Sequence, residues 1–281
     1  MIKLPFTIDL HGKVAAVTGA GGVLCSVFSK ALAACGARVI LIGRRIATVE
    51  KVADETMADG GECKAYEADV LDAAAMRKAA EKAAADFGPC NILVNGAGGN
   101  SPLATVDKEY YTTGDIDADI KSFFDLDPAG VRSVFDLNFL GTFIATQAFA
   151  RTMRSGDVVV NISSMNAFTP LTKIPAYSGA KSAVSNFTQW LAVYFSKSGI
   201  RVNAVAPGFF RTAQNEKLLF NENGAPTERT GKILSATPME RFGIPDDLIG
   251  TLLYLVSNES SGFVTGVVLP VDGGFSAYSG V

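Results

Sequence analysis

Two side chains capable of acid–base chemistry, Tyr177 and Lys181, stand four positions apart. On a helix this spacing places both side chains on one face, one turn apart. A phenol with a pKa of about 10 is a poor acid or base at neutral pH, but a neighbouring ammonium favours the phenolate. Ser164 precedes Tyr177 by thirteen residues, and its hydroxyl could hydrogen-bond a carbonyl oxygen beside the phenol. The three residues predict proton transfer at a substrate oxygen.

A glycine-rich turn, Thr18-Gly-Ala-Gly-Gly-Val-Leu-Cys25, follows an apolar run and opens a stretch of helix length. Glycines there let the backbone approach a pyrophosphate, whose charge the amides and dipole of a helix N-terminus stabilise. Gly19 and Gly21 match the start of G-x-G-x-x-G, whereas Leu24 occupies the position of its third glycine. The turn alone is a weak signal, and an ordinary tight turn is the alternative interpretation.

Arg44 and Arg45 end the second apolar run, where a dinucleotide fold that selects NAD usually has an acid for the ribose 2′-hydroxyl. Two guanidinium groups could instead pair with a 2′-phosphate. The pattern therefore favours NADP(H), with NAD(H) as the alternative. The alternative interpretation is that one or both arginines are solvated residues at the start of a helix.

Short β-branched runs alternate with amphipathic stretches of helix length. Strands are predicted at 14–18, 38–42, 62–68, 91–95, 157–162, 201–205 and 267–271, and helices at 23–35, 47–59, 73–87, 128–153, 175–198 and 246–256. Strands buried on both faces and joined by helices predict an α/β fold: a single-domain, Rossmann-type, doubly wound parallel sheet of about seven strands with helices on both faces. We expect residues 1–281 to form one dinucleotide-binding and catalytic domain, with substrate loops near 98–126 and 209–240.

Composition excludes several classes of protein. His11 is the only histidine among 281 residues, so the chain alone cannot form a multi-histidine metal site, and no metal is expected. A G-x-S-x-G nucleophile elbow is absent, and the four cysteines form no C-x-x-C pair, as is typical of free thiols in a reducing cytosol. A net charge of −3 with scattered cations indicates neither nucleic acid nor membrane as a partner. Without a recognisable signal or spanning segment, a cytoplasmic protein is expected.

Taken together, these motifs resemble the short-chain dehydrogenase/reductase family over about residues 10–275. Besides the glycine-rich turn, the likeness consists of Asp69-Val70 after the third predicted strand, Asn95-Gly-Ala-Gly98 after the fourth, Asn138, Ser164, Tyr177-Ser-Gly-Ala-Lys181, and Pro207-Gly208 with Thr212. The order and spacing are those of the family.

This resemblance implies a role for each matching residue. Tyr177 would be the general acid/base, Ser164 would polarise the substrate oxygen, and Lys181 would hold the nicotinamide ribose and lower the pKa of the phenol. Asn138 would position a water in the proton relay. Asp69 would contact adenine, and Thr212 the carboxamide or pyrophosphate. The expected cofactor-binding set is Gly19, Gly21, Gly22, Val23, Leu24, Arg44, Arg45, Asp69, Val70, Asn95, Gly96, Ala97, Tyr177, Lys181, Pro207, Gly208, Phe210 and Thr212.

Three positions depart from the family pattern. Its T-G-x-x-x-G-x-G has glycine where this chain has Val23 and Cys25, and its N-N-A-G has asparagine where this chain has Gly96. The geometry around the cofactor is therefore less well determined by the resemblance than the catalytic set.

A closer likeness is to the D-mannonate oxidoreductase (fructuronate reductase) branch, visible in 18–25, 207–215, 270–281 and the insertion 98–126. It implies hydride transfer between a nicotinamide cofactor and a secondary alcohol or ketone of a sugar acid, such as D-mannonate/D-fructuronate. The alternatives are another keto-sugar or 3-ketoacyl reductase, or a non-catalytic nucleotide-binding sensor. Arg211 is the expected carboxylate partner, although it could equally be a surface residue. The predicted substrate-binding set is Asn100, Ser164, Asn166, Arg211, Gln214 and Asn215.

The stretch 175–198 is apolar on nearly all sides, which indicates burial on more than one face. The resemblance implies a homotetramer in which the helices 128–153 and 175–198 pair across a two-fold axis. Phe187 and Leu191 are the expected outward contacts. A core helix in a monomer is the alternative.

Overall fold

One parallel sheet organises the molecule. The computed structural model describes residues 8–212, 219–221 and 223–280. In these residues seven strands pair in the order β3-β2-β1-β4-β5-β6-β7, each parallel to its neighbours. The strands are β1 (Val14–Thr18), β2 (Arg38–Gly43), β3 (Glu62–Glu67), β4 (Ile92–Asn95), β5 (Val158–Ile162), β6 (Arg201–Pro207) and β7 (Val268–Val271). The predicted doubly wound Rossmann-type α/β sheet is confirmed.

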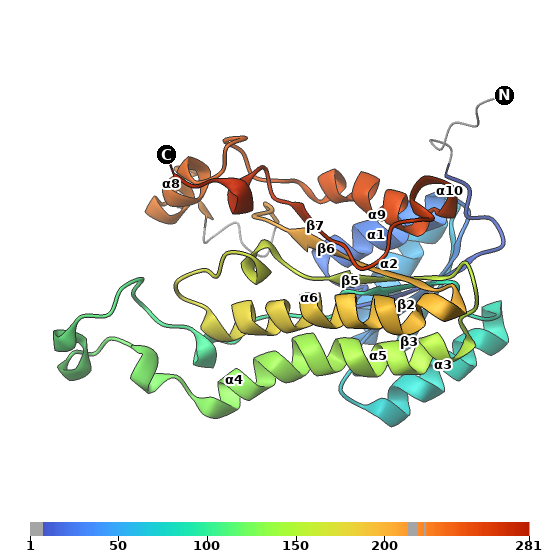
Figure 1. The fold of residues 1–281 in the computed structure, drawn as a ribbon, viewed down its shortest axis with the longest axis horizontal. Helices are drawn as coiled ribbons and strands as arrows, with labels where there is room; N and C mark the ends of the chain where they lie inside the picture. Colours follow the sequence, from blue (N-terminus) through green and yellow to red (C-terminus); the bar gives the residue numbers. More distant parts are fainter. Residues whose placement is uncertain (1–7, 213–218, 222, 281) are drawn as a thin grey trace.

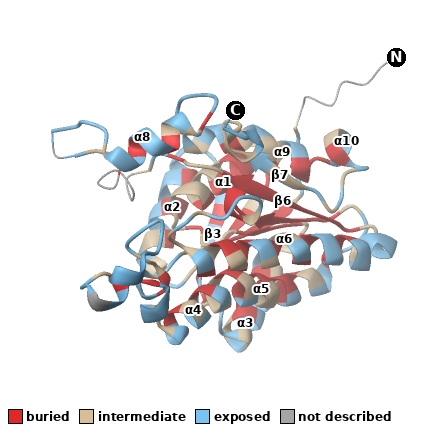
Figure 2. Cartoon of the chain, turned by 60° about the vertical axis from the view of Figure 1, so that its left-hand side comes forward, coloured by how far each residue is buried: buried red, intermediate tan, exposed pale blue. Residues whose placement is uncertain are grey.

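Helices cover both faces of the sheet (Figure 1). One layer contains α1 (Val23–Ala34), α2 (Ile46–Ala58) and α9 (Ile249–Val256), and the other contains α3 (Ala73–Phe87), α4 (Pro128–Phe135), α5 (Gly141–Phe149) and α6 (Pro175–Phe195). The short helix α10 (Asn258–Ser261) follows α9. Figure 2 shows the buried strands between these layers.

Successive side chains of each inner strand pack alternately into two apolar cores, one on each face of the sheet. In β1, Val17 packs into the cluster that contains Phe28 of α1, whereas Ala16 packs into the cluster that contains Met76 of α3. Successive side chains of a strand point to opposite faces, so a strand covered on both sides must be apolar throughout. The register places Thr18 opposite Ile42 on one side and Asn95 on the other. The ends of β1 and β4 therefore meet where the strand order reverses, which is the ligand-binding edge of such sheets.

The predicted helix 128–153 is helical from Pro128 to Thr152, but it is not a regular α-helix throughout. A π-helical turn, Asp136–Leu140, separates α4 from α5, and a 3₁₀ turn, Ala150–Thr152, ends the segment. Such a turn accommodates an extra residue in a helix and changes the direction of nearby side chains. The turn carries Asn138, which is completely buried.

Both expected substrate loops contain regular structure. Residues 98–126 include short 3₁₀ turns and form an arm that extends past the N-terminal end of α6 (Figure 1). The stretch 209–240, predicted to be irregular, contains α8 (Glu228–Ser235), whose N-cap Thr227 accepts from the amide of Thr230. The cap explains why this short polar segment is helical.

The outward face of α6 is not the one predicted. Phe187 and Leu191 are only 9% and 4% exposed, because they face α5 and the sheet. The exposed apolar side chains are Trp190, Val193 and Tyr194. The outward residues were therefore misassigned, and burial of the exposed apolar face stays a prediction. None of the helices in the described part of the chain is long and apolar enough to cross a membrane.

Candidate active site

Ser164, Tyr177 and Lys181 lie together at the carboxyl edge of the sheet. Ser164 follows β5 and caps a 3₁₀ turn by accepting from the amide of Asn166 at 3.3 Å. Pro175 begins α6, which places Tyr177 in the first turn of the helix and Lys181 one turn later. The hydroxyl of Ser164 acts on the phenol of Tyr177 and favours its ionised form. The structure thus brings together the three residues predicted to transfer a proton.

The ammonium of Lys181 is buried beneath this pair. Its side chain is 4% exposed, and Nζ donates to the carbonyl oxygen of Ile162 at 2.8 Å. Nζ also lies 5.6 Å from the centroid of the Tyr177 ring. Burial lowers the pKa of Lys181 to about 8. With one of its three N–H donors on Ile162, the ammonium retains donors for ligand hydroxyl groups.

The pKa of Tyr177 differs from the expectation. Lys181 was predicted to lower it, whereas in the structure the pKa is raised, because burial disfavours the phenolate more than the hydrogen bond from Ser164 favours it. Lys181 is not among the groups that shift this pKa. At neutral pH the phenol is therefore protonated and can donate to a substrate oxygen.

The amide of Asn138 holds the turn after β4. Its Nδ2 donates to the carbonyl oxygens of Gly99 at 2.7 Å and Val134 at 2.8 Å, and its Oδ1 accepts from the amide of Gly99 at 3.2 Å. The main-chain carbonyl of Asn138 accepts from the hydroxyl of Thr142 at 2.8 Å. The side chain therefore fixes the backbone beside Lys181, and the part of Asn138 in a proton relay stays a prediction.

The glycine-rich turn fits the diphosphate of a nicotinamide cofactor. Gly19 has a φ of +68°, and a Cβ there would lie 2.9 Å from the backbone of Ala97, so the two turns touch. The N-cap of α1 is Gly22, which has no side chain to cap the first turn, and that turn contains no acid. The amides after Gly22 and the positive end of the helix dipole are thus available to an anion. Gly21, Val23 and Leu24 belong to the same partly buried turn.

Two departures from the family pattern are coupled in space. A Cβ at Gly96 would overlap the sulfur of Cys25. The glycine on one turn thus makes room for the thiol on the other. Burial raises the pKa of Cys25 to about 12, so the thiol is unreactive at neutral pH. The backbone of Gly98 also approaches the site, since a Cβ there would lie 3.2 Å from Nζ of Lys181.

Of the residues expected around adenine and its ribose, Arg44 has a different environment from the one predicted. Nη1 of Arg44 lies 3.8 Å from Oδ2 of Asp69, and Oδ1 of Asp69 accepts from the amide of Leu71. Arg45 is exposed at the N-cap of α2, and Val70 is buried against Gly141. Arg44 therefore has a carboxylate close by instead of facing only a prospective phosphate.

Other members of the predicted cofactor set support the backbone. Asn95 is buried and donates to Thr146 and Asn161, both at 2.9 Å, and Thr18 accepts from the amides of Gly96 and Ala97. Pro207 ends β6, and the amide of the next residue, Gly208, donates to the carbonyl oxygen of Val271. Phe210 is buried against Gly243, and Thr212 is partly buried. Asn95 and Phe210 thus shape the site from beneath its surface.

The predicted substrate residues occupy different environments. Asn166 is buried, and its Oδ1 has no hydrogen-bond partner among the described residues. Asn100 is exposed and donates to Thr105 at 3.0 Å, while the guanidinium of Arg211 lies over the ring of Phe220 at 4.5 Å. Gln214 and Asn215 lie outside the described residues. Of Asn100, Asn166 and Arg211, only Asn166 is buried and has an unpartnered polar atom.

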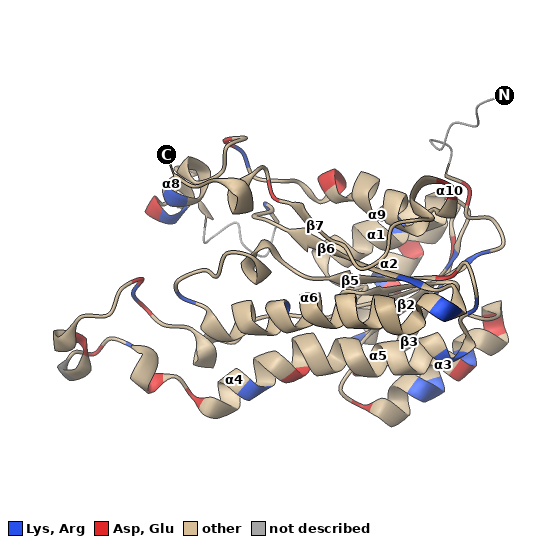
Figure 3. Ribbon diagram, in the orientation of Figure 1, with Lys and Arg blue, Asp and Glu red and all other residues tan. Residues whose placement is uncertain are grey.

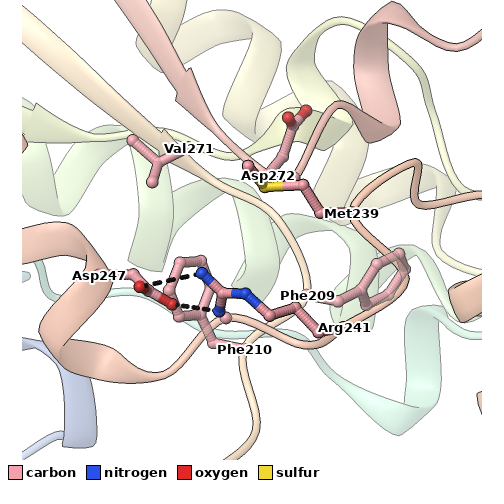
Figure 4. Close-up of a pocket in the computed structure, with 9 residues that line it drawn as sticks. Phe209, Phe210, Met239, Arg241, Asp247, Val271 and Asp272 are labelled. Carbon is pink, nitrogen blue, oxygen red and sulfur yellow. Dashed lines mark hydrogen bonds and ion pairs between the residues drawn. The ribbon is translucent and has the colours of Figure 1, made fainter.

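A cavity of about 220 Å³ lies behind the residues that follow Gly208 (Figure 4). Nη1 and Nη2 of Arg241 pair with the carboxylate of Asp247 at 2.7 and 3.1 Å. Both terminal nitrogens of the Arg241 guanidinium are thus occupied by the Asp247 carboxylate. This arrangement braces the segment that holds Phe210 rather than forming part of the reacting centre.

The comparisons with known proteins identify the family of this chain. The sequence model described as short chain dehydrogenase matches residues 13–223. The chain belongs to this family and is an oxidoreductase.

Three relatives span nearly the whole chain. A crystal structure with bound NAD, of a Haemophilus influenzae protein provisionally assigned as a D-mannonate oxidoreductase, has a TM-score of 0.94 and 54% identity, covering 97% of this chain and 98% of that one. The uncharacterized oxidoreductase UxuB of Bacillus subtilis is 48% identical, over 99% of this chain and 100% of its own. Gluconate 5-dehydrogenase of Gluconobacter oxydans is 33% identical, over 97% and 98%.

Proposed function

We propose that the protein catalyses reversible hydride transfer between NAD(H) and a secondary alcohol or ketone of a sugar acid, with D-mannonate/D-fructuronate as the substrate pair. The observation that carries the proposal is the placement of Ser164 and Tyr177 together at the carboxyl edge of the sheet, with the buried ammonium of Lys181 one turn further along α6. The provisional assignment of the Haemophilus influenzae relative and the activity in the name of the Gluconobacter oxydans relative support a sugar acid as substrate.

The nicotinamide ring, when bound, supplies the acceptor or donor of the hydride. In the reductive direction Tyr177 donates its proton to the carbonyl oxygen as the carbon receives the hydride, and in oxidation the phenolate takes that proton back. Ser164 donates a hydrogen bond to the same oxygen and so stabilises its developing charge. Lys181 would bind the ribose hydroxyls with its remaining N–H groups, and the amides after Gly22 would bind the diphosphate.

NAD(H) is preferred over NADP(H) in this proposal, in contrast to the sequence-based expectation. The short distance between Arg44 and Asp69 reduces the positive charge that a 2′-phosphate would meet, and Asp69 itself would repel it. The bound NAD of the Haemophilus influenzae relative supports the same choice. We keep Arg44, Arg45 and Asp69 as residues that would surround the adenosine ribose.

The proposal is tested by following the absorbance of reduced nicotinamide with D-mannonate, other sugar acids, keto-sugars and a 3-ketoacyl substrate. We expect turnover with a sugar acid, and a fall of roughly 10²–10⁴ in kcat for Tyr177→Phe with the cofactor still bound. Tyr278→Phe, an exposed tyrosine near the C-terminus, is the matched control. Near-normal turnover in Tyr177→Phe would refute the mechanism, and cofactor binding without turnover on any substrate would indicate a nucleotide sensor.

A further inference from the structure

A cavity of about 310 Å³ lies beside the first turn of α6. Its walls are 171–174, which lead from Ser164 to Tyr177, together with Phe209 after β6, one side of α8, and Phe275 near the C-terminus. Ligand cavities in proteins start at about 300 Å³. The cavity therefore adjoins the residues just before Tyr177 and parts of both expected substrate loops.

The charges around this cavity are unequal. Two carboxylates line it, and both pair with Lys232: Glu109 Oε1 lies 3.0 Å and Glu228 Oε1 3.2 Å from its Nζ. These contacts raise the pKa of Lys232 and keep it charged. Lys173 and Arg229 also line the cavity, and neither has a carboxylate within 4 Å in the part of the chain that the structure describes. The lining therefore carries one net positive charge, although Lys173 is close enough to Glu109 to lower the pKa of that carboxyl.

The remaining walls strengthen any ion pair formed there. Leu171, Ile174, Phe209, Ile233 and Phe275 are all apolar. An apolar surround lowers the effective dielectric constant, so a charged ligand group interacts more strongly with a cation there than it would in open solvent. In Figure 3, Lys and Arg positions mark both α8 and the segment that leads into α6, at the same end of the molecule.

We propose that Arg229 and Lys173 bind the carboxylate of the substrate, with the reacting carbon at Tyr177 and the anionic end toward α8. The inference rests on the proposed function and assigns the site that distinguishes a sugar acid from a neutral polyol. The planar fork of Arg229 suits a carboxylate in two-pronged contact, and Lys173 adds a point charge from the opposite wall. A single negative charge on the substrate neutralises the lining.

Neither residue stands out in the sequence. Lys173 lies four residues before Tyr177, and Arg229 lies in a segment expected to be irregular. Arg211, the residue predicted for this role, places its guanidinium over the ring of Phe220. The proposal therefore moves the carboxylate contact from the loop after β6 to α8.

The test compares Arg229→Gln and Lys173→Gln with the wild type on two substrates, D-mannonate and the neutral polyol D-mannitol. We expect the ratio of kcat/KM for the acid to that for the polyol to fall about 10-fold to 100-fold in each variant, mainly through the KM of the acid, since the loss of a hydrogen bond to a charged group has this effect. Arg229→Lys should recover part of the loss. Arg77→Gln, an exposed cation on α3 outside the cavity, is the matched control and should leave the ratio unchanged.

Two outcomes would overturn the inference alone. The first is a wild type that oxidises the acid while both variants keep its selectivity. The second is a loss of selectivity in Arg211→Gln that the Arg229 and Lys173 variants do not show. A wild type that oxidises only the neutral polyol would instead refute the sugar-acid substrate itself, and the carboxylate site with it. Thermal melts of each variant confirm that it is folded.

Discussion

Replacement of Lys181 by methionine should stabilise the cofactor-free protein while it abolishes turnover. Methionine fills a similar volume without carrying a charge into the interior. The burial that suits Lys181 for ligand binding also makes its ammonium unfavourable for folding. A residue that costs stability in the free protein is expected where a ligand later engages the charge.

The structure sets the magnitude of this effect. A pKa of about 8 in place of the ordinary 10.5 corresponds to about 3 kcal/mol of lost unfolding free energy at neutral pH. Methionine cannot donate to the carbonyl oxygen of Ile162, and the loss of that hydrogen bond costs about 1 kcal/mol. We therefore expect Lys181→Met to unfold with a free energy about 2 kcal/mol higher than the wild type at pH 7.

The sign of the pH dependence follows from the two pKa values. Below pH 8 the lysine is protonated in both states, and the full cost of burial applies. Between pH 8 and 10.5 the unfolded wild type binds more protons than the folded one, so the stability contributed by this group rises with pH. The advantage of Lys181→Met should therefore shrink by about 1 kcal/mol from pH 7 to pH 9.

Urea denaturation of both proteins at several pH values, without cofactor, measures this difference. Lys78→Met, an exposed lysine on α3, is the control and should show no such pH-dependent gain. NAD should raise the melting temperature of the wild type more than that of Lys181→Met, because the variant lacks the donors for the ribose. A variant that is less stable than the wild type at pH 7, or a difference that does not change with pH, would refute the reasoning.

Three further changes test other parts of the structure. Gly96→Asn should be strongly destabilising alone and be rescued by Cys25→Gly, with a coupling energy of about 1–3 kcal/mol from a double-mutant cycle in urea; additive effects would mean that the two turns do not share this space. Arg44→Ala should lower kcat/KM for NADP(H) more than for NAD(H), and a wild type more efficient with NADP(H) would contradict the cofactor proposal. Val193→Glu, on the exposed apolar face of α6 that also carries Trp190 and Tyr194, should dissociate the homotetramer that the family resemblance implies, as measured by light scattering. An active wild-type monomer at micromolar concentration would exclude that assembly.

Local patterns determined much of the fold. The prediction of a helix over 73–87 coincides with α3, whose alanine-rich sequence and Asp72 cap favour a helix before any tertiary contact forms. The apolar run 14–18 likewise coincides with β1. The pairing of Tyr177 with Lys181 was predictable for the same reason, since a spacing of four residues on one helix decides which side chains share a face.

Contacts between distant segments were not predictable in this way. The π-helical turn at Asn138 interrupts a segment whose sequence predicts an uninterrupted helix, and the amide of Asn138 finds its partner in Gly99, on another segment. The fit of Gly96 around Cys25 joins two turns that lie far apart in the sequence. The apolar pattern of α6 indicated two buried faces, but only packing against α5 decided that Phe187 is the inner residue.

The sequence by itself therefore determined the strands, most helices and the shared helix face of Tyr177 and Lys181, because these depend on the propensities and periodicity of neighbouring residues. Only the tertiary structure decided the raised pKa of Tyr177, the lowered pKa of Lys181 and the meeting of Lys173 with α8 around one cavity. Desolvation and charge balance are sums over every group that packs around a site, and those groups come from segments that folding brings together.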